Sequence, residues 1–279
     1  MNIVKNRYYI VTFILGFTYT LFSQQNSNHI QWQKIDEGLF LSEYLAPKKS
    51  ILGDHKITIL KINPSRYDFN LFSAKKKEEH TRTAKEWGNQ KKQIAIINAG
   101  MYRMDHATNL GYMKDYNFIN NPNENKDNTI VAFNRKDNSV PEFQIIDRTC
   151  QNWEVLKNKY NSFTQSIRMV DCNQKNRWSR QSKKWSMVAI GKDEEGNALF
   201  IISRSPYTVH DFINILLQAP LKLYNLMYLE GGPEASFYLN HNNTVVEKMG
   251  SYETGFNEND KNTVFWEIPN VIGITKKEN

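Results

Sequence analysis

The chain has 279 residues, a length compatible with one large domain that buries a substantial core. It contains 36 lysine and arginine residues against 29 aspartate and glutamate residues, which gives a formal net charge of +7. This excess is mild, and the basic residues are dispersed in short runs rather than gathered in one place. The composition therefore argues against nucleic acid as a partner.

The first 23 residues have the layout of a secretory signal peptide. Lys5 and Arg7 precede an apolar run from Tyr8 to Phe22, and the sequence becomes polar at Ser23. A run of about 15 apolar residues is shorter than the roughly 20 that a transmembrane helix needs, although an uncleaved anchor stays open as an alternative. We therefore expect residues 1–23 to be a signal peptide. Residues 24–279 would form an exported domain, periplasmic or extracellular, with membrane contact only through an uncleaved leader.

The chain contains two cysteines, Cys150 and Cys172. In an exported protein, an isolated pair that flanks one segment favours a structural disulfide over a metal site or a catalytic thiol. Two buried free thiols are the alternative, because the sequence does not show that the two Cα atoms approach each other.

Strand signals dominate the chain. Short runs of β-branched and aromatic residues are bounded by Asn, Asp, Gly or Pro, as is typical of strands. In chain order these runs are Lys56–Ile62, Tyr67–Ser73, Gln93–Asn98, Thr129–Phe133, Glu142–Ile146, Ser186–Ile190, Ala198–Ser203, Leu226–Leu229, Ala235–Leu239 and Val271–Thr275.

Helix signals are fewer. One helix is predicted over Thr83–Asn89, and another begins at Thr208, where Asp211 three residues later makes a start that resembles a capping box. The polar stretch Asn120–Asn128 is predicted to be an exposed loop. We therefore expect an α+β fold, namely a mixed, mostly antiparallel, curved β-sheet packed with a few helices in a single domain.

Two apolar strands end directly in glycine and polar residues. The first continues into Asn98, Ala99 and Gly100, where small residues let the backbone turn closely around a neighbour or ligand. The second continues into Glu230, Gly231 and Gly232, where backbone N–H groups can face a ligand. In each case an ordinary turn is the alternative, with Asn98 capping it or with Glu230 exposed to solvent.

The motifs around these two strand ends resemble those of the phosphodiester glycosidase family. The segments are IINAGMY at residues 96–102, LGYM at 110–113 and MYLEGGPEASFYL at 227–239. Between them, residues 166–178 and 186–206 resemble the middle section of that family, and the order of these segments makes the resemblance specific. The family includes an enzyme that removes N-acetylglucosamine from a phosphodiester, so the resemblance implies hydrolysis of a sugar-1-phosphodiester.

The resemblance also implies the site residues. Asn98 and Gly100 match the first signature of the family, and Glu230, Gly231 and Gly232 match its acidic-Gly-Gly segment. Two positions depart from the family pattern. The family more often has Asp where this chain has Glu230, and it has Arg where this chain has Met187.

An enzyme that acts on a phosphodiester needs a planar, permanently charged donor for the phosphate oxygens. We expect Arg168 and Arg204, which lie beside predicted strand ends, to supply this donor and to act with Glu230 and Asn98. Glu230 would lie near the anomeric carbon, where it would activate water, attack the carbon or bind sugar hydroxyls. Tyr102 is expected to line the sugar site beside Gly100 because it adjoins the Asn98 turn, although most tyrosines on strands are packing residues.

No cofactor is required by this chemistry. Asp105, His106 and His210 do not have the spacing of a metal site, and a divalent cation held by carboxylates near Asn98 stays open without support. Two other functions compete with the enzyme. One is a non-catalytic protein that binds a glycan or phosphosugar, for which Met187 is the best argument, and the other is a structural surface protein held by an uncleaved leader.

Overall fold

The computed structural model describes residues 30–76 and 79–278. The predicted signal peptide, residues 1–23, lies outside these residues. Among the residues that the structure describes, no helix is long and apolar enough to cross a membrane.

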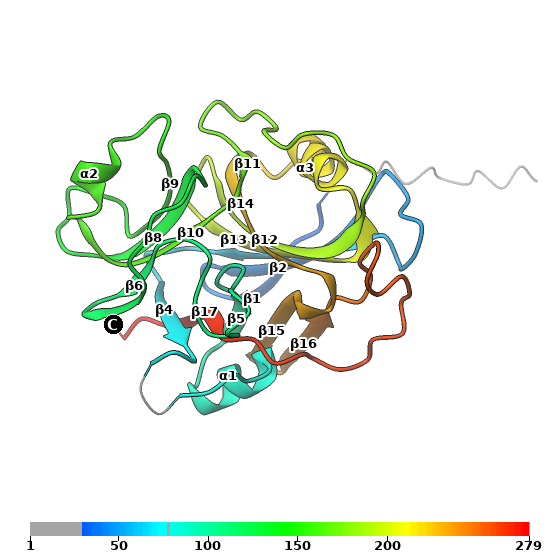
Figure 1. The fold of residues 1–279 in the computed structure, drawn as a ribbon, viewed down its shortest axis with the longest axis horizontal. Coiled ribbons are helices and arrows are strands. Elements are labelled where there is room, and N and C mark those ends of the chain that lie inside the picture. The colour runs from blue at the N-terminus through cyan, green and yellow to red at the C-terminus, as the bar shows by residue number, and fades with distance from the viewer. Residues whose placement is uncertain (1–29, 77–78, 279) are drawn as a thin grey trace, which may run out of the picture.

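A seven-stranded antiparallel sheet forms the centre of the molecule (Figure 1). Its strand order is β1 (Gln33–Asp36), β2 (Leu39–Leu45), β3 (Lys56–Ile62), β13 (Ala198–Tyr207), β12 (Trp185–Asp193), β14 (Leu223–Gly231) and β11 (Arg168–Val170). The inner strands are buried on both faces, which explains their nearly continuous apolar sequences. On β13, for example, Phe200 faces one core and Ile201 faces the other.

Helix α3 (Val209–Gln218) covers one face of this sheet. Thr208 is its N-cap and accepts a hydrogen bond from the backbone N–H of Asp211, as the sequence predicts. Phe212, Ile213 and Leu216 on the buried side of the helix pack against the central sheet. Tyr228 and Trp185, which line the candidate site described below, pack on the same face as this helix.

A five-stranded antiparallel sheet packs against the other face of the central sheet (Figure 1). Its order is β16 (Thr244–Met249), β15 (Ser236–His241), β5 (Ala95–Asn98), β17 (Asn270–Lys276) and β4 (Tyr67–Ser73). Helix α1 (Ala84–Gln90) covers its outer face through the fully buried Trp87. Thr83 and Glu86 form a complete capping box at the start of this helix.

A second five-stranded antiparallel sheet flanks these layers and carries the short helix α2 (Trp153–Leu156). Its order is β7 (Phe118–Asn121), β6 (Met113–Asp115), β10 (Tyr160–Ser166), β8 (Thr129–Arg135) and β9 (Phe143–Asp147). Trp153 from the helix packs edge-on against Phe163 of β10. The three sheets meet in one core of buried aliphatic and aromatic side chains.

The observed architecture confirms the predicted α+β fold with mostly antiparallel strands and few helices. Every pair of neighbouring strands among the described residues is antiparallel. The polar stretch Asn120–Asn128 is only partly a loop, because Asn120 and Asn121 belong to β7 and are buried. The Asn120 amide is held by Ser73, Ala107 and Asn270, so a buried hydrogen-bond network replaces the expected solvent contact.

Cys150 and Cys172 form the predicted disulfide, which closes a loop across 22 residues of sequence. A cross-link of this loop length removes chain entropy from the unfolded state. We therefore expect the double variant Cys150→Ser/Cys172→Ser to lose about 3 kcal/mol in its free energy of unfolding. Urea denaturation of the oxidised protein and of this variant checks the expectation. Equal unfolding midpoints would show that the cross-link does not stabilise the fold.

Candidate active site

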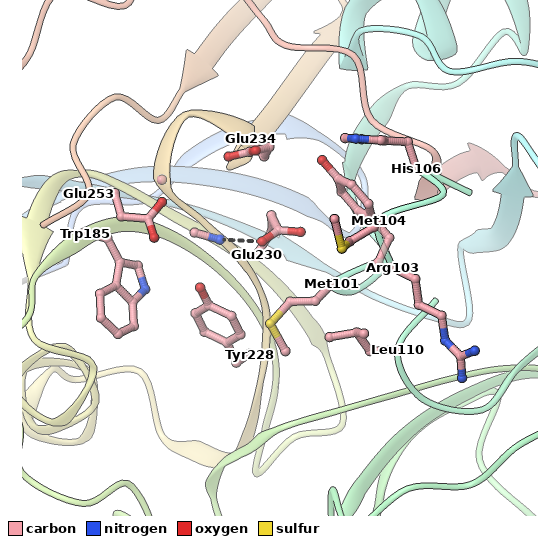
Figure 2. A pocket seen from close by; sticks show the side chains of 13 residues that line it. Met101, Arg103, Met104, His106, Leu110, Trp185, Tyr228, Glu230, Glu234 and Glu253 are labelled. Carbon is pink, nitrogen blue, oxygen red and sulfur yellow. Dashed lines mark hydrogen bonds between the residues drawn. The ribbon is translucent and has the colours of Figure 1, made fainter. Parts of the chain in front are cut away.

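A pocket of 470 Å³ opens where strand β14 ends (Figure 2). Three parts of the chain line it: the end of β14 with the turn η1 (Gly232–Glu234), the segment 101–110, and the pair Trp185 and Glu253. Both glycine-containing strand ends that the sequence indicates therefore lie close to one cavity.

Glu230 lies at the centre of the pocket (Figure 2). Because side chains alternate along a strand, Glu230 lies on the same face of β14 as the buried Tyr228. One Glu230 carboxylate oxygen accepts a hydrogen bond of 3.0 Å from the backbone N–H of Gly231. Burial raises the pKa of Glu230 to about 8, and the Glu234 and Glu253 carboxylates add to this increase while the Gly231 N–H opposes it. The side chain is thus protonated at neutral pH.

Two further carboxylates lie beside Glu230. Gly232 has a φ of +62°, and a Cβ atom placed there would lie 2.5 Å from Glu253 Oε2 and 3.5 Å from Glu234 Oε2. These two oxygens are therefore at most about 6 Å apart. Burial and the Glu253 carboxylate raise the pKa of Glu234. A glycine at position 232 is needed both for the left-handed backbone and for the space that the carboxylates occupy.

Aromatic side chains form the wall beside Glu253. A Cβ atom at Gly231 would lie 2.5 Å from Trp185 Cδ1 and would also overlap the Tyr228 hydroxyl group. Tyr228 is 5 % exposed, and its ring contacts Trp178 at a centroid distance of 5.5 Å. The absence of a side chain at Gly231 therefore lets both rings approach the pocket.

Residues 101–110 form the opposite wall as a closed hairpin. Leu110 N donates to Met101 O (2.9 Å), and Arg103 N donates to Thr108 O (2.8 Å). Figure 2 shows Arg103 and His106 on the side of the pocket opposite to Trp185 and Glu253. Arg103 is exposed and has no ion pair or side-chain hydrogen bond to the residues that the structure describes. The pocket thus has a carboxylate side and a cationic side.

Asn98 joins the two signature segments from beneath the pocket. It is 1 % exposed, its amide nitrogen donates to Glu234 O (3.0 Å), and its amide oxygen accepts from Ser236 N (2.8 Å). Gly100, at a φ of +141°, leaves space for the Asn109 side chain. Neither Asn98 nor Gly100 lines the pocket. Asn98 positions the turn that carries Glu234, whereas Gly100 makes room for Asn109.

We expect Asn98→Ala to lower the free energy of unfolding by about 2 kcal/mol, because it leaves the buried Ser236 N–H without its partner and removes one of the two side-chain hydrogen bonds that Glu234 O accepts. Urea denaturation checks this value. Asn240→Ala is the control, since the exposed Asn240 makes one side-chain hydrogen bond, to the Tyr238 hydroxyl group. Equal stability of the two variants would contradict the bracing role of Asn98.

A family model described as phosphodiester glycosidase matches residues 91–275, two thirds of the chain and all the segments that form the pocket. The chain belongs to the phosphodiester glycosidase family. No curated protein matches its sequence.

Two solved structures share the fold of this phosphodiester glycosidase family member. A hypothetical protein from Synechocystis has a TM-score of 0.59 at 13% identity, with 89% of this chain and 64% of that chain covered. The catalytic domain of zebrafish N-acetylglucosamine-1-phosphodiester alpha-N-acetylglucosaminidase, auto-inhibited by its pro-peptide, has a TM-score of 0.58 at 13% identity, with coverages of 89% and 82%. This chain spans less than two thirds of the Synechocystis protein.

The two arginines expected to bind phosphate in this member of the phosphodiester glycosidase family lie outside the pocket. Arg168 Nη1 pairs with the fully buried Asp147 and bonds to Thr149, each at 2.8 Å. Arg204 pairs with Asp260 at 2.7 Å and donates to backbone oxygens at both ends of segment 249–262. Both guanidinium groups are occupied by protein acceptors, so Arg204 supports the segment that carries Glu253 instead of facing the cavity.

Met187, the second departure from the family pattern, is fully buried in the core beside Tyr228 and does not line the pocket. Arg103 is the arginine that lines the cavity, with its guanidinium directed away from Glu230 (Figure 2), while Met101, Met104 and Leu110 give the same wall an apolar part. One wall of the pocket therefore carries both an arginine and apolar side chains.

The sequence-based reasoning missed Glu234, Glu253, Arg103 and Tyr228 as lining residues. Glu234 lies inside the quoted Gly-Gly motif, so its position four residues after Glu230 was an available signal. Glu253 comes from a segment without strand or helix signals, and its bridge to Trp185 is one of the contacts that bring it to the site. The one group of potential metal ligands among residues 30–76 and 79–278 is Asp147 with Cys150 and Cys172, and these cysteines are already joined to each other.

Proposed function

We propose that this protein hydrolyses a sugar-1-phosphodiester outside the cytoplasm. The observation that supports this most is the pocket itself, in which a carboxyl group with a pKa of about 8 lies beside two other carboxylates, while Arg103 belongs to the opposite wall. A protonated carboxyl group beside further carboxylates is the arrangement that glycosidic cleavage uses. Arg103, which makes no ion pair with the residues that the structure describes, could bind a phosphate group from the opposite wall.

In the proposed reaction the bond between the anomeric carbon and the phosphate oxygen breaks. Glu230 donates its proton to that oxygen as the phosphate monoester leaves, and water supplies the hydroxyl group of the free sugar. The remaining proton of that water restores Glu230. Glu234 and Glu253 would stabilise the positive charge that develops on the sugar ring, because preorganised carboxylates act strongly in a partly desolvated site.

The two sides of the pocket suggest how the substrate is oriented. Trp185 and Tyr228 supply ring surface for a pyranose on the carboxylate side. Arg103 would bind the non-bridging phosphate oxygens on the other side. Tyr102 lies in the hairpin between these regions, and burial raises the pKa of its hydroxyl group, so this group stays protonated and can donate a hydrogen bond to the substrate.

The raised pKa of Glu230 predicts the pH dependence of the reaction. The reactive form is the protonated one, so kcat/KM should be highest below the pKa and should fall about tenfold per pH unit above about pH 8. A pH profile of kcat/KM on one phosphodiester between pH 5 and 10 measures this limb. A flat profile through this range would contradict proton donation by Glu230.

The substrate class is tested by incubating residues 24–279 with methyl phosphodiesters of glucose, mannose and N-acetylglucosamine and with the matching methyl glycosides. Release of sugar from phosphodiesters alone supports the proposal. If neither class is cleaved while the sugar phosphates still bind, the protein is a phosphosugar-binding member of the family, which is the second function that the apolar part of the wall favours.

Export is supported by the Cys150–Cys172 disulfide, since such bonds persist in oxidising compartments. Mass spectrometry of the protein recovered outside the cytoplasm tests it. A mature chain that begins near residue 24 is expected, and recovery of the full-length chain only from the cytoplasm would contradict export.

A further inference from the structure

The hairpin of residues 101–110 carries apolar side chains that the hydrolytic chemistry leaves unexplained. Met101, Met104 and Leu110 all line the pocket on the same side as Arg103 (Figure 2). Met104 is 97 % exposed and Leu110 is 40 % exposed. Neither side chain is therefore used mainly to fill the core, and their apolar surface is available to a ligand.

The hairpin holds these side chains in place. Besides the two backbone hydrogen bonds that close it, the Asp105 carboxylate accepts bonds from Ala107 N, Thr108 N and Thr108 Oγ1 at 2.6–3.1 Å. The Asp105 carboxylate, the one carboxylate in this hairpin, is therefore hydrogen-bonded within the hairpin. A leaving group rich in hydroxyls would find few acceptors here, whereas an apolar one would find thioether and aliphatic surface.

Resting on the proposed function, we propose that the leaving group of the substrate is an alkyl or isoprenoid phosphate. Arg103 fixes the phosphate, the sugar extends from it towards the carboxylates, and the other ester oxygen leads the apolar chain across Met104 and Leu110. Continuity of this apolar wall with the pocket supports this occupant, as does the charge complementarity between Arg103 and the phosphate. Methionine suits a flexible chain because its unbranched thioether adapts its shape.

The inference is tested by binding, which does not require turnover. Calorimetry compares methyl phosphate with octyl phosphate, the latter below its micelle-forming concentration. We expect octyl phosphate to bind at least tenfold more tightly, a difference that burial of about two methylene groups accounts for. Met104→Ser/Leu110→Ser should reduce this ratio to about two. Val155→Ser, which changes an exposed apolar residue on α2, should leave the ratio unchanged.

Equal affinities for the two phosphates, or an unchanged ratio in the double variant, would overturn the inference. Hydrolysis of the octyl and methyl phosphodiesters of one sugar then separates it from the proposed function. Tight octyl phosphate binding without cleavage of either diester would refute hydrolysis and leave the apolar subsite established. Cleavage of both diesters with equal kcat/KM and equal binding would refute the apolar leaving group and leave hydrolysis established.

Discussion

Glu230→Gln should reduce kcat on a sugar-1-phosphodiester by about 100-fold or more, since it removes the proposed proton donor while keeping its shape. The same variant should be more stable than the wild type at high pH. A carboxyl group whose pKa is raised on folding contributes stability that is complete below its unfolded value near 4.5 and is lost as the pH rises through about 8. Glutamine does not ionise, so the stability difference between the two proteins should grow between pH 5 and 9.

Thermal unfolding across this pH range, together with initial rates, measures both effects. Glu195→Gln is the matched control, because Glu195 lies on the surface and pairs with the exposed Lys222. This control should keep both the activity and the pH dependence of stability. Retention of more than a tenth of the activity by Glu230→Gln would show that another group donates the proton.

Arg168→Ala should change the stability of the protein, whereas Arg103→Ala should change its KM. Arg168→Ala leaves the buried Asp147 carboxylate without its ion-pair partner, so the free energy of unfolding should fall by about 4 kcal/mol. Arg103→Ala removes an exposed side chain that makes no ion pair with the described residues, so stability should stay within about 0.5 kcal/mol of the wild type. Its KM should instead rise by about tenfold or more, because a charge-assisted contact to the phosphate is lost.

Urea denaturation and Michaelis–Menten kinetics on both variants measure the contrast, with Arg180→Ala as a surface control. A normal KM in Arg103→Ala combined with a raised KM in a correctly folded Arg168→Ala would indicate that Arg168, one of the two arginines expected from the sequence, binds the phosphate.

The strands that sequence patterns located best are those rich in β-branched and aromatic residues. The bounds of β3 and β4 match the predicted segments, because their runs of β-branched and aromatic residues end at turn-forming residues. Strand β10 was missed because its sequence, YNSFTQS, is mostly polar. Ser162, Thr164 and Gln165 are nevertheless buried there, and hydrogen bonds to other segments satisfy them. Such partners are distant in sequence, so no local pattern indicates them.

In the site, too, a local sequence pattern indicates some residues, while others depend on contacts that are distant in sequence. Glu230 and its glycines could be identified from a contiguous motif, whereas Glu253 reaches the pocket only because Ser186 N donates to Tyr252 O and Arg204 holds the ends of its segment. Arg168 and Arg204 were expected to bind phosphate because they lie beside predicted strand ends. That position does not show that a guanidinium already pairs with an aspartate, as Arg168 does with Asp147 and Arg204 does with Asp260.

The closed hairpin at residues 101–110 places the proposed leaving-group surface on a different segment of the chain from the carboxylates. The carboxylates come from β14, its turn and the Glu253 segment, while the surface proposed to receive the leaving group comes mostly from this one short segment, whose ends bond to each other. Such a segment is a natural unit for exchange by recombination or by a designed library of residues 103–108. The family could thus acquire new leaving-group preferences through one local replacement, without rebuilding the carboxylate cluster.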